Sequence, residues 1–274
     1  MAGKRKILIG SYGALGDVLC QMGGVKIFAE RNPDAKLTFV TVNTLAEQVV
    51  RNNDFLGDII RVSHEEFHPF MEKAEGYDEK IKFKIKFSRA WRWRFNLPRA
   101  FAAYTFGIKV NRPYAVLKEK EKSEAEKIIK DMDLDPFIIA GPHKASTDKR
   151  KLWPAERWQE TLDRLPEPYR IVCVGGADDK KYSGERVVNF YGEPILTVGA
   201  LLDRCSLYIG VDNGITNFAW ALGVPKVVQI YSSVTPRFWT PVPGAEVLYG
   251  DVTRIEPAQV LKRAEKLLKR NSEK

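Results

Sequence analysis

Short apolar runs recur along the chain, and each is followed by a polar turn and then by a pattern of helical period. Runs of strand length lie at residues 6–10, 37–42, 59–62, 135–141, 171–174, 207–211 and 226–231. Helical patterns lie at residues 18–29, 44–51, 118–131, 155–165, 216–222 and 257–269. Strands that alternate with helices in this way predict an α/β protein with parallel sheets covered by helices on both faces.

The stretch 205–241 shows this pattern most completely. A buried strand at 207–211 is interrupted by Asp212-Asn213-Gly214, and a helix follows that Gly223 and Pro225 bring to an end. In open α/β sheets ligands bind at the carboxyl ends of strands, and the backbone N–H groups of a helix start suit a phosphate. The turn is therefore a candidate phosphate site, with the alternative that Asp212 and Asn213 only cap the helix.

A second loop of this kind follows the first strand. Gly10, Gly13 and Gly16 are spaced G-x-x-G-x-x-G, which differs from the G-x-G-x-x-G of dinucleotide-binding folds. Asp17 comes directly after the last glycine, where a carboxylate suits a base facing a cleft. The alternative is that Asp17 only complements the dipole of the following helix.

The segment from residue 80 to residue 99 is basic and aromatic. KIKFKIKF at 80–87 alternates lysine with apolar residues, so its lysines share one face of a strand, and arginines interleave with large aromatic residues directly afterwards. We interpret it as a surface for phosphates or lipid headgroups, with a solvated basic strand face as the alternative. Its candidate residues are Lys82, Lys84, Lys86, Arg89, Arg92, Arg94 and Arg99.

Composition narrows the class of protein. The 274 residues carry a formal charge of +9, which favours an anionic partner, and no recognition motif supports nucleic acid. No apolar run is long enough to span a bilayer and no secretory signal is evident, so we expect a cytoplasmic protein. The three cysteines and three histidines lack metal-ligand spacing, and we expect no metal and no cofactor.

Four blocks of sequence, taken in order, resemble the glycosyltransferase family 9 heptosyltransferases of lipopolysaccharide synthesis. They are GALGDVL at 13–19, KLWP at 151–154 with Trp158, VGG at 174–176, and DNG at 212–214 running through AWALGVP at 219–225. The last block continues into YSSVTP at 231–236, which is similar to the family's strand-end loop. Asn217 stands where the family has a histidine, and Asn213 stands where it has a hydroxyl residue.

The resemblance implies a GT-B fold, in which two Rossmann-like domains with parallel sheets face a central cleft. We expect an acceptor domain at residues 1–130 and a donor domain at residues 131–274, whose last helix could pack back on the first domain. Asp17 matches the catalytic base and Lys151 the lysine that neutralises the departing diphosphate. The residues implied in donor binding are Gly16, Ser146, Thr147, Gly176, Asp179, Asp212, Asn213, Gly214 and Asn217.

The implied activity is an inverting, metal-independent transfer of a sugar, heptose first among the candidates. The donor is a nucleotide-diphospho-sugar such as ADP-heptose, and the acceptor is a lipopolysaccharide-core-like or other anionic glycan. The basic, aromatic segment at 80–99 suits a phosphorylated, membrane-anchored acceptor, so we expect peripheral attachment to the inner membrane leaflet. Two alternatives stay open. One is a non-catalytic nucleotide-sugar-binding protein that docks on anionic surfaces, and the other is an epimerase of the same fold acting on UDP-sugars.

Overall fold

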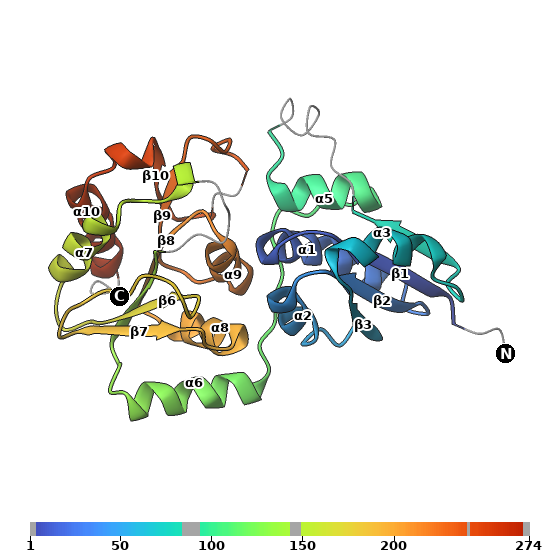
Figure 1. Cartoon of the computed structure of the whole chain (residues 1–274), viewed down its shortest axis with the longest axis horizontal. Coiled ribbons are helices and arrows are strands. Elements are labelled where there is room, and N and C mark those ends of the chain that lie inside the picture. The colour runs from blue at the N-terminus through green and yellow to red at the C-terminus, as the bar shows by residue number, and fades with distance from the viewer. Residues whose placement is uncertain (1–3, 84–93, 143–148, 240–241, 271–274) are drawn as a thin grey trace. The chain divides into compact units, whose positions relative to one another are not determined.

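The computed structural model describes residues 4–83, 94–142, 149–239 and 242–270, and it divides the chain into two compact α/β units. The first unit is Met1–Val116 and the second is Leu117–Lys274. Each unit contains one parallel sheet with helices packed against it (Figure 1). This confirms the fold class that the alternation of strands and helices predicts.

The sheet of the first unit has the strand order β3-β2-β1-β4, with every described pairing parallel. Its strands are β1 (Lys6–Ser11), β2 (Lys36–Thr41), β3 (Asp58–Arg61) and β4 (Glu79–Lys82). Its helices are α1 (Leu15–Arg31), α2 (Thr44–Val50), α3 (His64–Lys73) and α5 (Leu97–Phe106). The central strand β1 carries the glycine loop at its carboxyl end, so that this loop opens at the edge where α/β sheets bind ligands.

Two glycines allow close packing in the first unit, one between helices α1 and α5 and the other between strand β1 and helix α3. A methyl group added to Gly24 of α1 would lie 3.2 Å from the Cβ of Ala102 in α5. A Cβ on Gly10 in β1 would lie 2.6 Å from the sulfur of Met71, which belongs to α3. Phe67 and Met71 bury the apolar side of α3 against Leu8 of β1 and Val40 of β2. The missing side chain at Gly10 therefore sets how closely α3 packs on the central strand.

The sheet of the second unit has the order β10-β9-β8-β5-β6-β7 and is also parallel. Its strands are β5 (Phe137–Gly141), β6 (Arg170–Gly175), β7 (Val187–Tyr191), β8 (Leu207–Val211), β9 (Val227–Ser232) and β10 (Glu246–Gly250). Its helices are α6 (Glu119–Asp131), α7 (Ala155–Arg164), α8 (Ile195–Arg204), α9 (Gly214–Leu222) and α10 (Pro257–Lys269), with short 3₁₀ turns η1 (Lys149–Lys151) and η2 (Val252–Arg254). Figure 1 shows α7 and α10 on one side of this sheet and α8 and α9 on the other.

Two helices of the second unit bear on the predicted domains. Helix α6, which the sequence analysis assigned to the first domain, packs on α8, and Glu126 forms an ion pair with Arg204 at the end of α8. The boundary between the two compact units therefore lies before α6, between Val116 and Leu117. Ala125 and Ile129 on the apolar side of α6 are buried. Helix α10 packs on α7 and on strands β8, β9 and β10 of its own unit.

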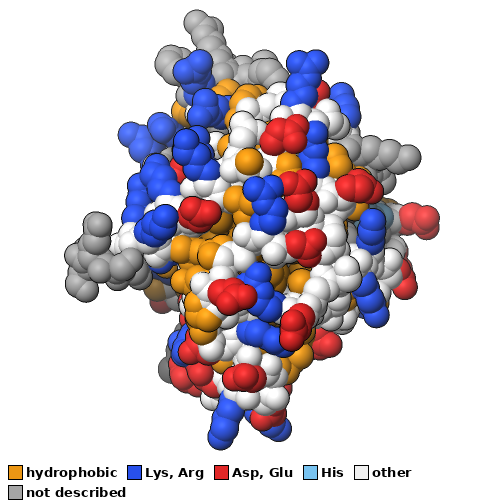
Figure 2. Space-filling view, turned by 90° about the vertical axis from the view of Figure 1, so that its left-hand side faces the viewer, with side chains coloured by type: hydrophobic (Ala, Val, Ile, Leu, Met, Phe, Trp, Pro, Cys, Tyr) orange, Lys and Arg blue, Asp and Glu red, His pale blue; other side chains and the backbone are white. Residues whose placement is uncertain are grey.

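The face of the chain around α7 and α10 carries charges of both signs (Figure 2). Glu246 on β10 is surrounded by Lys266, Arg263 and Arg270. The hydrogen bond from Lys266, followed by the charges of the three cations, lowers the pKa of its carboxyl group. Arg157 of α7 pairs with Glu256 at 2.8 Å in the same way. Around Glu246 and Glu256, part of the positive charge is thus paired with acidic groups.

Candidate functional site

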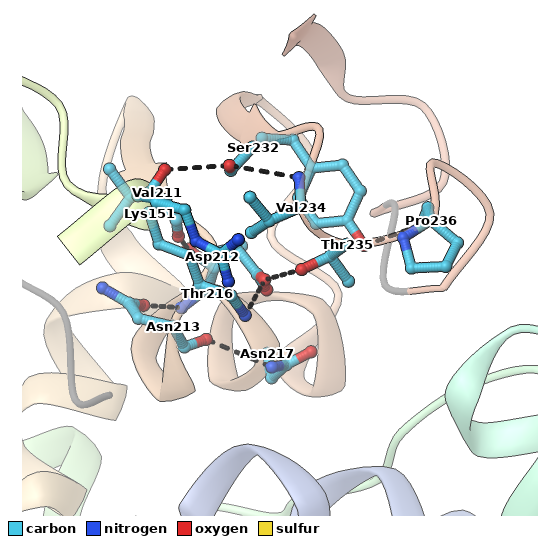
Figure 3. A network of polar contacts seen from close by, with 12 residues as sticks. Lys151, Val211, Asp212, Asn213, Thr216, Asn217, Ser232, Val234, Thr235 and Pro236 are labelled. Atoms are coloured by element: carbon cyan, nitrogen blue, oxygen red, sulfur yellow. Dashed lines mark hydrogen bonds and ion pairs between the residues drawn. The ribbon is translucent and has the colours of Figure 1, made fainter. Parts of the chain in front are cut away.

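The turn between β8 and α9 places two neighbouring polar residues in different roles (Figure 3). The side-chain oxygen of Asn213 accepts a hydrogen bond from the backbone N–H of Thr216 at 2.9 Å, so that Asn213 is the N-cap of α9. The side-chain amide of Asn217 donates to the Asn213 carbonyl at 3.1 Å. The side chain of Asn213 thus caps the helix, whereas the carboxylate of Asp212 contacts a different partner.

That partner is Lys151, whose Nζ lies 2.7 Å from Oδ2 of Asp212. The lysine side chain is 22% exposed and the aspartate side chain 9%, so the pair is largely withdrawn from water while the ammonium group keeps some access to it. The hydroxyl of Thr235 lies 3.4 Å from the same carboxylate oxygen. The structure therefore brings together three polar groups from η1, the turn after β8 and the loop after β9.

The loop after β9 is tied to η1 by Ser232. Its hydroxyl donates to the carbonyl of Arg150 at 2.9 Å and lies 3.4 Å from the backbone nitrogen of Val234. Tyr231 donates from its hydroxyl to the Pro236 carbonyl at 3.0 Å. These bonds hold the segment that carries Thr235 against η1, which contains Lys151 (Figure 3).

Beneath the turn lies a buried pair that the sequence analysis did not single out. The hydroxyls of Tyr208 and Thr216 are 2.9 Å apart, and Thr216 donates to the carbonyl of Val211 at 2.5 Å. Both residues are buried, and burial holds the pKa of Tyr208 above its ordinary value, so that the phenol stays protonated. The Tyr208 ring fills the space that side chains at Gly141 and Gly210 would occupy, which leaves these two strand positions to glycine.

Gly176 and Asp179 lie in the loop after β6, at the same carboxyl edge as the Lys151–Asp212 pair. Strand β5 separates β6 from β8 in the sheet. The Asp179 carboxylate accepts a hydrogen bond from the backbone N–H of Gly176 at 2.7 Å, and therefore closes its own loop. Ser146 and Thr147, the two predicted donor-binding hydroxyl residues, lie outside the described residues.

In the first unit, Asp17 occupies the first turn of α1, directly after Gly16. Its Oδ2 accepts a hydrogen bond from the backbone N–H of Ala14 at 3.2 Å. A Cβ on Gly13 would lie 2.5 Å from the Cβ of Asp17, so the glycine loop packs directly on this side chain. Asp17 thus complements the helix dipole and is held in one orientation, half-buried, at the carboxyl end of β1.

Part of the predicted basic surface falls within the described residues. Lys82 lies 3.6 Å from Glu72, and the guanidinium of Arg99 lies 4.3 Å from the centre of the Phe95 ring. Arg94 is exposed and has a positive φ of 49°. The remaining candidates, Lys84, Lys86, Arg89 and Arg92, lie outside the described residues.

The described residues contain neither a metal-binding cluster nor a membrane-spanning helix. No three histidine, cysteine or acidic side chains come together there as a set that could hold a metal ion. None of the helices in the described part of the chain has the length and apolar character to cross a membrane.

The chain has the fold of solved glycosyltransferases of the GT-B type. The chain is similar to a glycosyltransferase family 9 protein of Veillonella parvula DSM 2008 at a TM-score of 0.76 and 18% identity, with 98% of each chain covered. It is similar to E. coli ADP-heptose lps heptosyltransferase II at a TM-score of 0.74 and 19% identity, covering 98% of this chain and 99% of that one. It is also similar to the dodecameric, iron-containing heptosyltransferase TibC of enterotoxigenic E. coli, solved with ADP-D-beta-D-heptose, at a TM-score of 0.68 and 16% identity, covering 97% and 76%.

The family model of glycosyltransferase family 9 (heptosyltransferase) matches residues 82–267, which is more than half of the chain. The chain therefore belongs to glycosyltransferase family 9 and is a glycosyltransferase. No curated protein matches it. The family that the four sequence blocks suggested is thereby confirmed, whereas the roles of individual residues stay predictions.

Replacing Thr216 by valine tests the buried pair beneath the turn. The variant keeps the shape of the side chain but leaves the Tyr208 hydroxyl without its partner, which costs roughly 1–3 kcal/mol in free energy of unfolding. Thr216→Ser retains the hydroxyl and is expected to lose less. Urea unfolding of the three proteins measures the difference, and equal stability of wild type and Thr216→Val would show that the pair does not support the turn.

Proposed function

We propose that this glycosyltransferase transfers heptose from ADP-heptose to an anionic glycan acceptor, with inversion at the anomeric carbon and without a divalent metal. The observation that carries the proposal is the position of Lys151. Its ammonium group, paired with Asp212, stands at the turn from which α9 begins. A fixed cation and a helix start at one place provide what a departing diphosphate requires.

The helix contributes backbone donors to this site. Asn213 satisfies the N–H of Thr216, while the helical geometry offers no carbonyl partner inside α9 to the N–H groups of Gly214 and Ile215. Such first-turn donors lie at the positive end of the helix dipole and favour an anion. Together with the ammonium of Lys151 they would hold the two phosphates without a metal ion.

In the reaction, a hydroxyl oxygen of the acceptor attacks the anomeric carbon of the donor while the bond from that carbon to the diphosphate oxygen breaks. We assign Asp17 as the base that takes the hydroxyl proton, since the Ala14 N–H and the packing of Gly13 hold its carboxylate in place. ADP leaves with the bonding electrons, and Lys151 stabilises its added charge. Displacement from the opposite face inverts the anomeric centre.

The donor and acceptor classes have separate support. One structural neighbour is an ADP-heptose heptosyltransferase and another was solved in complex with ADP-D-beta-D-heptose, which favours ADP over other nucleotides. The positive net charge and the exposed Arg94 favour an anionic glycan or glycolipid acceptor, reached by peripheral contact with the membrane from the cytoplasm.

Lys151→Ala is expected to lose most of the thermal stabilisation that ADP gives to the wild type. Removing the charge weakens binding of the diphosphate by about tenfold or more, because charge-assisted bonds to phosphate are strong. Lys122→Ala is the matched control, since Lys122 also forms an ion pair in the second unit, with Glu119 at 3.0 Å. Each variant is compared with and without ADP by melting, because loss of one partner of a buried pair lowers stability by itself.

If Lys151→Ala and Lys122→Ala respond to ADP as the wild type does, the diphosphate is bound elsewhere. If ADP does not stabilise the folded wild type but a UDP- or GDP-sugar clearly does, the site would stand with a different donor nucleotide.

Asp17→Asn is expected to abolish transfer while leaving ADP binding intact. The amide is isosteric but cannot accept the hydroxyl proton, and loss of a general base lowers the rate roughly 100- to 10,000-fold. The measurement is release of ADP from ADP-heptose in the presence of a lipopolysaccharide-core acceptor. Unchanged turnover in the variant would remove Asp17 from the mechanism.

A further inference from the structure

Tyr12 is an exposed aromatic residue in the glycine loop, directly after β1. Its side chain keeps 48% of its surface exposed, although three rings of α3 surround it. The ring centre lies 5.0 Å from that of His64, in an edge-on arrangement, and 5.4 Å from that of Phe67. The His68 ring stacks on it at 5.5 Å with an interplanar angle of 26°. The Tyr12 ring of the loop is thus packed against three rings of α3.

Local structure explains why these rings meet. Ser63 and Glu66 form a reciprocal cap at the start of α3, in which the Ser63 hydroxyl accepts from the Glu66 N–H at 3.2 Å and the Glu66 carboxylate accepts from the Ser63 N–H at 2.9 Å. The cap fixes where the helix begins, and Gly10 lets the helix pack closely on β1. His64 and His68, one turn apart, therefore both reach Tyr12, and both are exposed.

The loop that carries Tyr12 also leads to the carboxylate assigned as the base. Gly13, the next residue after Tyr12, packs on Asp17, and the loop from Tyr12 to Asp17 is closed by the bond from the Ala14 N–H to the carboxylate. In a loop of this length, an exposed ring and a half-buried carboxylate lie at the same edge of the sheet. A sugar that rests on the ring would bring its hydroxyls to the neighbourhood of Asp17.

We propose that Tyr12, supported by His64 and His68, is the platform on which the acceptor sugar ring stacks. This inference rests on the proposed function, because it gives Asp17 the acceptor hydroxyl as its target. Tyr12 is then a residue that binds the acceptor and contributes to its selection.

The chemistry of a pyranose fits such a platform. One face of the sugar ring presents C–H groups, which pack on the negative face of an aromatic ring, while its hydroxyls stay in the plane around it. The imidazoles of His64 and His68 present nitrogen donors and acceptors at the margin, where those hydroxyls lie. Because neighbouring rings already hold Tyr12, little side-chain freedom is lost on binding.

The chemistry also limits which sugars the platform accepts. Stacking requires an uninterrupted patch of C–H groups, so the platform selects on the configuration of the neutral sugar ring rather than on its phosphate groups. Anionic groups of the acceptor would be bound by other residues, and the two contributions are separable by experiment.

The test uses the full chain with methyl α-D-mannopyranoside and methyl α-D-glucopyranoside as probes, and saturation-transfer NMR as the readout. Wild type is expected to transfer saturation to the C–H protons of at least one glycoside. Tyr12→Phe keeps the ring and is expected to retain the signal. Tyr12→Ala and Tyr12→Leu are expected to weaken binding by about tenfold, and the leucine variant keeps apolar bulk against Phe67 in case the alanine variant does not fold.

ADP-induced thermal stabilisation is measured on the same proteins and is expected to be equal in all four. No glycoside contact in folded wild type, or equal contact in Tyr12→Leu and wild type, overturns the platform. Failure of the proposed donor site looks different, because ADP then gives no stabilisation while glycoside contact at Tyr12 persists.

Discussion

The ion pair between Lys151 and Asp212 is the interaction on which the candidate site depends. Without such a partner, a lysine side chain beside a helix start could turn out into solvent. Its ammonium group would then have to be repositioned for each reaction. Pairing with a carboxylate that is 9% exposed holds the ammonium group in place before any substrate arrives. A charge oriented in advance stabilises a leaving group without reorganisation at the moment of reaction. Removing Lys151 takes the counter-charge away from a carboxylate that is largely withdrawn from water, and is therefore expected to lower stability.

The position of this pair follows from the parallel sheet beneath it. Parallel strands end at one edge, so η1, the turn after β8 and the loop after β9 meet there although they are far apart in sequence. The buried hydroxyl pair of Tyr208 and Thr216 ties the last residue of β8 to the first turn of α9. Ser232 then fixes the β9 loop to η1. Each step restrains the backbone on one side of the ion pair, and the glycines at 141 and 210 leave room for the ring that supports it.

Much of this arrangement could be predicted from the sequence, and there are physical reasons why the rest could not. The strand, turn and helix around Asp212 were readable from apolar periodicity, and Gly223 ends α9 in the left-handed conformation expected of a C-terminal glycine. The separate roles of Asp212 and Asn213 were not readable, because both residue types cap helices equally well and the deciding partner, Lys151, is distant in sequence. Tyr208 and Thr216 lie in apolar runs that look like ordinary core.

Helices α3, α5 and α8 and strands β7 and β10 also escaped prediction. Helix α3 contains Pro69 in its interior, which argues against a helix by local rules. Helix α8 is apolar over most of its length and is buried, so that its sequence lacks the polar face that marks a surface helix. Strand β10 is only partly buried and has no clear alternation. In α3, burial of Phe67 and Met71 outweighed the local effect of the proline.

Backbone hydrogen exchange with ADP and with AMP shows whether a diphosphate binds where α9 begins beside Lys151. We expect ADP to slow exchange in the first turn of α9 and around Lys151, and AMP, which lacks the second phosphate, to do so much less. Protection by ADP confined to other segments, or equal protection by AMP, would contradict binding of the diphosphate there.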